Sequence, residues 1–214
     1  MKLALILLAV LVGAFLLKRL AGFVLLRLVG GWVGRAVGQA ALAQQPDAIH
    51  LASVDPDSWL DRDAAHALAF EFRAHGFADA GTFKVVEMHG VRVRLLAHEA
   101  GGMLAAIYEH PQVGQWFDVV ARYGDGTSIT FTTSRPTGLD PRPGHPIIHA
   151  PAATSPRALV ERAGWERPPG PLAPASAADV VRLFEQAYAD VTAWRKQRGI
   201  SAHEVAQVAM REAA

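Results

Sequence analysis

Apolar and polar residues alternate between Thr82 and Thr133, and this pattern predicts five β-strands joined by short turns. Each turn carries glycine, and the turn lengths fit hairpins rather than the longer crossovers of parallel strands. We therefore predict an antiparallel meander. The four turns are His89-Gly90, Glu99–Gly102, Pro111–Gly114 and Gly124–Gly126.

The pleat predicts one apolar and one polar face for this sheet, because alternate side chains point to opposite sides. Pairing Tyr123 with Thr127 places apolar residues on one face, and these are Phe117, Val119, Ala121, Ile129 and Phe131. The reverse face carries Asp118, Arg122, Ser128, Thr130 and Thr132. Pairing Met88 with Val91 predicts a cross-strand ion pair between Glu87 and Arg92. Such a sheet can leave its polar face in water or present it to a partner.

Helices are predicted on either side of the meander. Asp55 to Ser58 supplies polar caps for a helix that ends at Gly76, and its apolar stripe would cover the apolar face of the sheet. The stripe consists of Leu60, Ala64, Leu68 and Phe72. Ser155 begins a short helix that closes at Gly164. Ser176 begins a longer one that ends at Gly199, and Ser201 with Glu204 forms a capping box for a last helix.

The predicted fold class is α+β: a helix packed on a five-stranded antiparallel meander, with C-terminal helices and an N-terminal membrane helix. Four segments follow from the composition. They are an anchor and juxtamembrane helix at 1–43, the sheet domain at 44–164, a Pro-rich linker at 165–175 and a helical pair at 176–214. The helical pair either packs on the sheet or binds another protein.

The residues from Leu3 to Leu17 carry no charge and are followed by Lys18 and Arg19, which predicts a single-pass membrane anchor. Fifteen helical residues reach only about 22 Å, so the two cations must snorkel or the helix must extend to cross a core of roughly 30 Å. Two alternatives stay open. One is a signal peptide cleaved after Ala43, which would leave a periplasmic or secreted domain, and the other is a buried hairpin.

Positive charges after the anchor outnumber those before it, and the positive-inside rule then places the soluble domain in the cytoplasm. Lys18, Arg19, Arg27 and Arg35 follow the apolar run, whereas Lys2 precedes it. The predicted partners are the lipid bilayer and a protein in the membrane. A net charge of +1 gives no footprint for nucleic acid.

The absence of cysteine (Cys 0) excludes disulfides, zinc thiolate sites and cysteine nucleophiles. The chain also lacks the sequence motifs of nucleotide binding, serine hydrolases, zinc proteases and EF-hands. We therefore predict no cofactor and no metal.

The loop after the fifth strand holds the densest set of reactive side chains, namely Asp140, Arg142, His145 and His149. Together with Asp118 and Arg122 of the polar face they are candidates for a hydrolytic or metal site. In an extended segment His145 and His149 lie about 13 Å apart, too far to share one ion. A proline-stiffened loop that seals the sheet edge is the competing interpretation.

Three classes of function remain. The first is a non-catalytic interaction or accessory subunit of a bacterial membrane complex, with Phe184 and Trp194 as partner-binding residues. The second is a small-molecule or lipid-binding envelope domain, in which Arg92, Arg94 and Arg122 of the sheet receive an anion. The third is a hydrolase that uses the His145/His149 loop. We expect the first.

Overall fold

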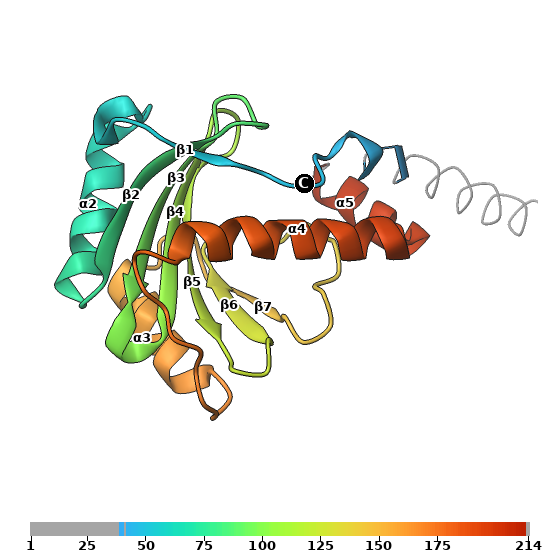
Figure 1. The fold of residues 1–214 in the computed structure, drawn as a ribbon. Helices are drawn as coiled ribbons and strands as arrows, with labels where there is room; N and C mark the ends of the chain where they lie inside the picture. The colour runs from blue at the N-terminus through green and yellow to red at the C-terminus, as the bar shows by residue number, and fades with distance from the viewer. Residues whose placement is uncertain (1–38, 41, 213–214) are drawn as a thin grey trace, which may run out of the picture.

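The computed structural model describes residues 39–40 and 42–212. Within these residues the chain forms a seven-stranded sheet whose strands lie in sequence order, with helices on both faces (Figure 1). The predicted α+β class is confirmed. The strands are β1 (Leu51–Ser53), β2 (Ala78–Val85), β3 (Arg92–His98), β4 (Met103–His110), β5 (Gly114–Arg122), β6 (Ser128–Thr132) and β7 (Ile147–His149).

The five predicted antiparallel strands are present, but the whole sheet has seven strands and is mixed. Strands β2 to β6 are the five predicted strands, and β1 and β7 extend the sheet at its two edges. β7 pairs in parallel with β6, because the loop that follows β6 carries the chain back before β7 begins. Both added strands have only three residues.

The two predicted hairpin registers had different outcomes. At the Gly124–Gly126 turn, Tyr123 N donates to Thr127 O at 2.9 Å, and Val119 lies opposite Phe131, as predicted. At the first hairpin the register is shifted, because Lys84 rather than Glu87 lies opposite Arg92. The predicted Glu87–Arg92 ion pair is therefore replaced. Glu87 instead accepts hydrogen bonds from His50, with 2.8 Å from the backbone N to Oε2 and 2.6 Å between Nδ1 and Oε1.

One face of the sheet is covered by α2 (Arg62–Ala74) and α3 (Pro156–Glu166) (Figure 1). The predicted first helix begins later than expected, because residues 56–58 form a separate 3-10 turn, η1, and Asp61 caps α2 by accepting from Ala64 N at 3.1 Å. This start changes the buried stripe to Ala65, Ala69 and Phe72. Leu60, a predicted core residue, is 77% exposed.

The other face is covered in part by α4 (Val180–Arg198), which crosses the sheet (Figure 1). Here the prediction of one polar face fails for the central strands. Residues 93–97 of β3 and 103–107 of β4 are all buried, so both sides of these strands need an apolar cover. α4 supplies the second cover, and its first residue, Val180, packs in a cluster with Phe83, Leu95 and Leu104.

The last helix, α5 (Ala202–Glu212), is fastened to the rest of the domain by one buried carboxylate. Ser201 N donates to Glu204 Oε2 at 2.8 Å and Glu204 N donates to Ser201 Oγ at 3.2 Å, which confirms the capping box. Glu204 Oε1 also accepts from Asp140 N at 2.9 Å and pairs with the Arg198 guanidinium. Burial alone would raise the pKa of Glu204, but these hydrogen bonds lower it to about 2.

The N-terminal part of the described chain lies along α4. Leu42 and Ile49 are buried, and Lys196 Nζ donates to Gln45 O at 2.8 Å and to Asp47 Oδ1 at 2.7 Å. Among the described helices, none combines the length and the apolar character that a membrane span requires. The predicted anchor residues Leu3, Leu17, Lys18 and Arg19 lie outside the described residues.

Replacing Glu204 with Gln removes the charge that holds α5 and the Asp140 loop together. We expect the free energy of unfolding at pH 7 to fall by about 1.5–3 kcal/mol, the range for hydrogen bonds to a charged group. Because the folded-state pKa of Glu204 lies below its ordinary value, its contribution is present above about pH 4.5 and is lost as the pH falls toward about 2. Urea unfolding of both proteins between pH 3 and 8 measures this effect.

The matched control is Glu161→Gln, which removes an exposed ion pair with Arg157 at 2.8 Å. It should change stability by no more than about 0.5 kcal/mol. Equal effects of the two substitutions at pH 7 would contradict the role of Glu204.

Candidate functional site

The four loop residues predicted as a catalytic or metal site do not come together. Arg142 Nη1 lies 3.4 Å from Asp190 Oδ2 on α4, and the Asp140 carboxylate lies 3.5 Å from Arg198 Nη1. His149 Nδ1 lies 2.9 Å from the backbone oxygen of Ser134. Asp140 and Arg142 thus bind two positions on α4, and His149 binds the chain just after β6. In residues 39–40 and 42–212 no group of three or more His, Asp or Glu side chains is placed to hold a metal ion.

His145 is the member of this set that joins other reactive groups. Its Nδ1 lies 2.8 Å from Ser128 Oγ at the start of β6, and Ser128 N donates to Gly144 O at 3.1 Å, which holds the two residues side by side. Arg122, at the end of β5, is the direct cross-strand neighbour of Ser128. We call Arg122, Ser128, Arg142 and His145 the His145 cluster.

The electrostatics of the cluster favour a neutral imidazole. Burial lowers the pKa of His145, and the nearby charges of Arg142 and Arg122 lower it further. The carboxylates of Asp190 and Asp125 oppose this effect without cancelling it. His145 is therefore uncharged at neutral pH, and its Nδ1 can accept a hydrogen bond from the Ser128 hydroxyl.

A hollow of about 380 Å³ lies beside the same hairpin, and Ser128, Gly144 and Pro146 are among the residues that line it. Tyr123, Thr127 and Ile129 form one wall, and the linker residues 168–171 form the opposite wall. The linker is held in place because Tyr123 Oη donates to Pro168 O at 2.7 Å and Gly124 N donates to Pro171 O at 3.1 Å. The hollow is thus preformed, with aromatic and proline walls.

Asp118, the other polar residue predicted for the site, lies on β5, the strand that ends at Arg122. Its Oδ1 is buried without a hydrogen-bond partner among the described residues. Burial raises the pKa of Asp118 to about 6, although the hydroxyls of Thr132 and Tyr108 favour the charged form. Burial beside Asp118 also raises the pKa of Tyr108. Asp118 lies four residues before Arg122 on β5 and does not belong to the His145 cluster.

The two residues predicted to bind a partner lie on α4. Phe184 packs against the buried cluster of that face, with its ring centroid 6.0 Å from that of Tyr108. Trp194 is half-buried, and the Arg198 guanidinium lies 4.7 Å above its ring. Their role in partner binding stays a prediction.

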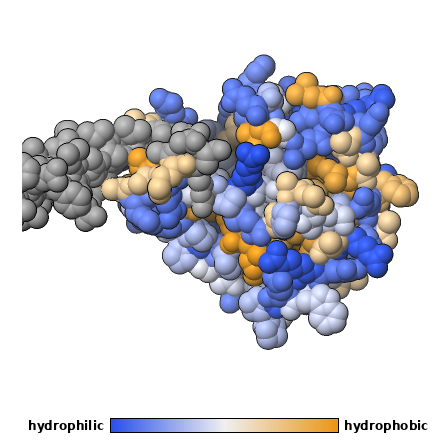
Figure 2. Space-filling view, turned by 180° about the vertical axis from the view of Figure 1, so that it is seen from behind, coloured by the Kyte–Doolittle hydropathy of each residue, from blue (hydrophilic) through white to orange (hydrophobic). Residues whose placement is uncertain are grey.

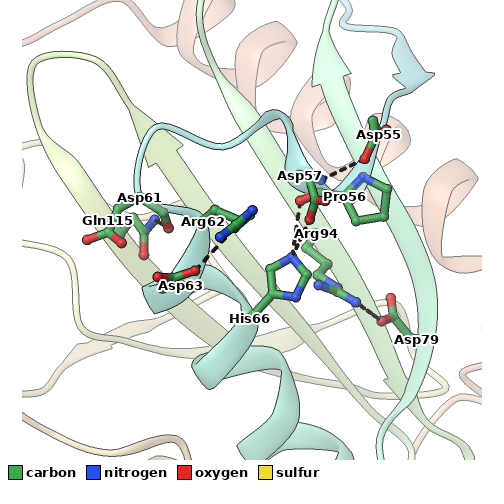
Figure 3. A network of polar contacts seen from close by, with 10 residues as sticks. All are labelled: Asp55, Pro56, Asp57, Asp61, Arg62, Asp63, His66, Asp79, Arg94 and Gln115. Atoms are coloured by element: carbon green, nitrogen blue, oxygen red, sulfur yellow. Dashed lines mark hydrogen bonds and ion pairs between the residues drawn. The ribbon is translucent and has the colours of Figure 1, made fainter.

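A polar network at the junction of α2 with the sheet was not predicted (Figure 3). His66 Nε2 lies 3.2 Å from Asp57 Oδ1, and beneath this pair Arg94 Nε lies 3.0 Å from Asp79 Oδ2. Arg94 was predicted to help receive an anion, but it is 7% exposed and paired with Asp79. Its carboxylate partner offsets the cost of burying the charge. We interpret this network as structural.

Exposed apolar side chains do not identify a further site. Figure 2 shows the face opposite to the view of Figure 1, where apolar residues form small areas separated by hydrophilic ones. The exposed side chains include Phe70 and Trp165, at 67% and 87%. Single exposed apolar residues are ordinary on soluble proteins. Comparison with protein families, with curated proteins and with solved structures finds no match for this chain.

The buried Asp118 predicts a measurable pH dependence. Because its folded-state pKa lies above its ordinary value, the charged form destabilises the fold, and stability should fall as the pH rises from about 4 to about 6. We expect Asp118→Asn to raise the free energy of unfolding at pH 8 by roughly 1–3 kcal/mol and to leave it little changed at pH 4. Denaturant unfolding at both pH values checks this.

Asp125→Asn is the control, and its effect on stability at pH 8 should have the opposite sign. Its hydrogen bonds from Thr127 lower the pKa of Asp125, so neutralising it should lower stability at pH 8. An Asp118→Asn variant that is no more stable than the parent at pH 8 would show that Asp118 is not strained by burial.

Proposed function

We propose that this protein is a membrane-tethered, non-catalytic binding module that acts as an accessory subunit of a bacterial membrane complex. The tether is the apolar run from Leu3 to Leu17, and Lys18 and Arg19 flank it on the side that faces the cytoplasm. The observation that carries the proposal is the proline-walled hollow beside the β5–β6 hairpin.

The hollow suits the anchor side chain of a partner or a small apolar ligand. Its volume of about 380 Å³ lies in the range of ligand pockets, and its apolar lining comes from four prolines, Tyr123 and Ile129. Residues that fill such pockets carry much of the binding energy at protein interfaces. Because hydrogen bonds from Tyr123 and Gly124 already fix the linker, binding would pay little additional ordering entropy.

The packing of the N-terminal segment supports tethering at a defined position. Residues 42–51 are fixed to α4 through Lys196 and through Glu185 Oε1, which accepts from Leu51 N at 2.7 Å. Figure 1 places this segment beside α5, away from the end of the β5–β6 hairpin. A tether that leaves from residue 42 would therefore leave the hollow open to a partner.

A second candidate is a small-molecule or lipid-binding envelope domain, and the same hollow favours it. The two candidates differ in what occupies the hollow. A protein partner would co-purify at a fixed ratio, whereas a small ligand would appear as added mass on the isolated subunit.

Filling the hollow should abolish binding. Gly124 lines the hollow, has no positive φ, and a Cβ added there would meet Pro171 O at an ordinary 3.9 Å. We expect Gly124→Trp to remove the co-purifying partner or ligand from full-length protein extracted in mild detergent. Native mass spectrometry with a thermal unfolding curve measures occupancy and folding together.

Two variants control for unrelated effects. Gly124→Ala adds a side chain too small to fill the hollow, and Gly164→Trp adds the same bulk on α3, where a Cβ has open space. Both should retain the partner. A folded Gly124→Trp variant that keeps its partner would exclude the hollow as the binding site.

A further inference from the structure

The His145 cluster adjoins the hollow, because Ser128 and the two chain neighbours of His145, Gly144 and Pro146, line it. Arg122 and His145 themselves do not line the hollow, and Tyr123 and Ile129 pack on the other face of the sheet. Arg122 and Ser128 belong to the set of β5 and β6 residues that point to the α4 side, whereas Ile129 packs in the core beneath α2 and α3. In Figure 1 the lower parts of β5 to β7 extend beyond the span of α4. Arg122, Ser128 and His145 are half-buried, so a small solute can reach them.

Within the described residues, the ion pairs and hydrogen bonds around His145 leave the Arg122 side chain without a charged partner. Arg142 is paired with Asp190, whose other oxygen accepts from Gln186 Nε2 at 2.7 Å. The Asp125 carboxylate accepts from the Thr127 amide and hydroxyl at 2.9 and 2.7 Å. The Arg122 guanidinium has no ion pair or hydrogen bond within residues 39–40 and 42–212.

The hydrogen bond with Ser128 determines which ring nitrogen of His145 carries the proton. When Nδ1 accepts a hydrogen bond from the Ser128 hydroxyl, the proton of the neutral ring resides on Nε2, which can then donate to a ligand. Arg122 is the cross-strand neighbour of Ser128, so it lies on the same side of the hairpin. The two groups together provide a charged fork and a neutral donor, the combination that recognises planar or tetrahedral oxyanions.

We propose that Arg122 and the Nε2–H of His145 bind a small oxyanion of the phosphate class, with Ser128 as the residue that orients the imidazole. Arg142 adds positive potential from the rim, although its pairing with Asp190 makes it the weaker contributor. The site goes beyond the proposed function, because Arg122 and His145 do not line the hollow and need no partner there.

Inorganic phosphate is the probe, added at constant ionic strength and neutral pH to full-length protein in an uncharged detergent. Histidine ring signals from selectively labelled protein report on the site, with His145→Gln used for assignment among the nine histidines. We expect a saturable shift of the His145 signal and a rise in its pKa with phosphate, because a bound anion stabilises the charged imidazole.

Arg122→Gln should weaken phosphate binding about tenfold or more, as expected for the loss of a charged hydrogen bond. Arg135→Gln removes an exposed arginine just beyond β6 and should leave binding unchanged. Ser128→Ala should weaken binding less than Arg122→Gln and alter the tautomer signature of His145. This last change distinguishes an orienting role from a merely structural one.

A lipid headgroup and a free phosphate share this chemistry, and a second titration, with a lipid, distinguishes the two sources. A short-chain phosphatidic acid below its micelle concentration should act at lower concentration than inorganic phosphate only if the source is a lipid. The proposal is overturned if the His145 shift is linear in phosphate, or if Arg122→Gln and Arg135→Gln respond alike. Retention of a partner by the same samples tests the hollow independently.

Discussion

The burial of β3 and β4 on both faces is the constraint on which the rest of the structure depends. All residues from 93 to 97 and from 103 to 107 are buried, so this half of the sheet is stable only between two apolar layers. α2 and α3 form one layer and α4 forms the other. α4 is thereby held in one place. α5 binds the C-terminal end of α4 through Arg198, and the segment at residues 42–51 binds α4 through Glu185 and Lys196.

The remaining half of the sheet has a different character, and the candidate sites lie there. On β5 and β6 the α4-side residues are mainly polar, including Arg122, Ser128 and Thr130, and they do not require an apolar cover. The hairpin that joins the two strands extends beyond α4 (Figure 1). The linker packs against Tyr123 of this hairpin, and the loop with His145 binds Ser128. One structural element thus carries both the hollow and the His145 cluster.

The sequence predicted the fold best where local chemistry decides the geometry. The Gly124–Gly126 hairpin and the Ser201/Glu204 capping box depend on residues close in sequence, and both are present. The first hairpin was predicted in the wrong register, because the turn from Val86 to Gly90 is wider than the His89-Gly90 pair suggested. Two-sided burial was missed because Arg94 interrupts the apolar pattern of β3, and its partner Asp79 is distant in sequence.

The candidate site shows the same limit. The sequence named His145, Arg142 and Arg122 as reactive residues, but it grouped them with Asp140 and His149, which bind elsewhere. Ser128 appeared only as a residue of the polar face. Its pairing with His145 depends on β7 lying beside β6, a parallel contact that no turn signal announces. The hollow depends on the linker folding back onto Tyr123, which its composition does not specify.

The most direct test of a tethered binding module is the intact mass of the full-length protein purified from its native membrane in mild detergent, together with the identity of whatever co-purifies at a fixed ratio. The account predicts a mass that includes residues 1–43 and a reproducible partner. A mass that begins at Gln44, with no partner and no bound ligand, would contradict both the tether and the binding role.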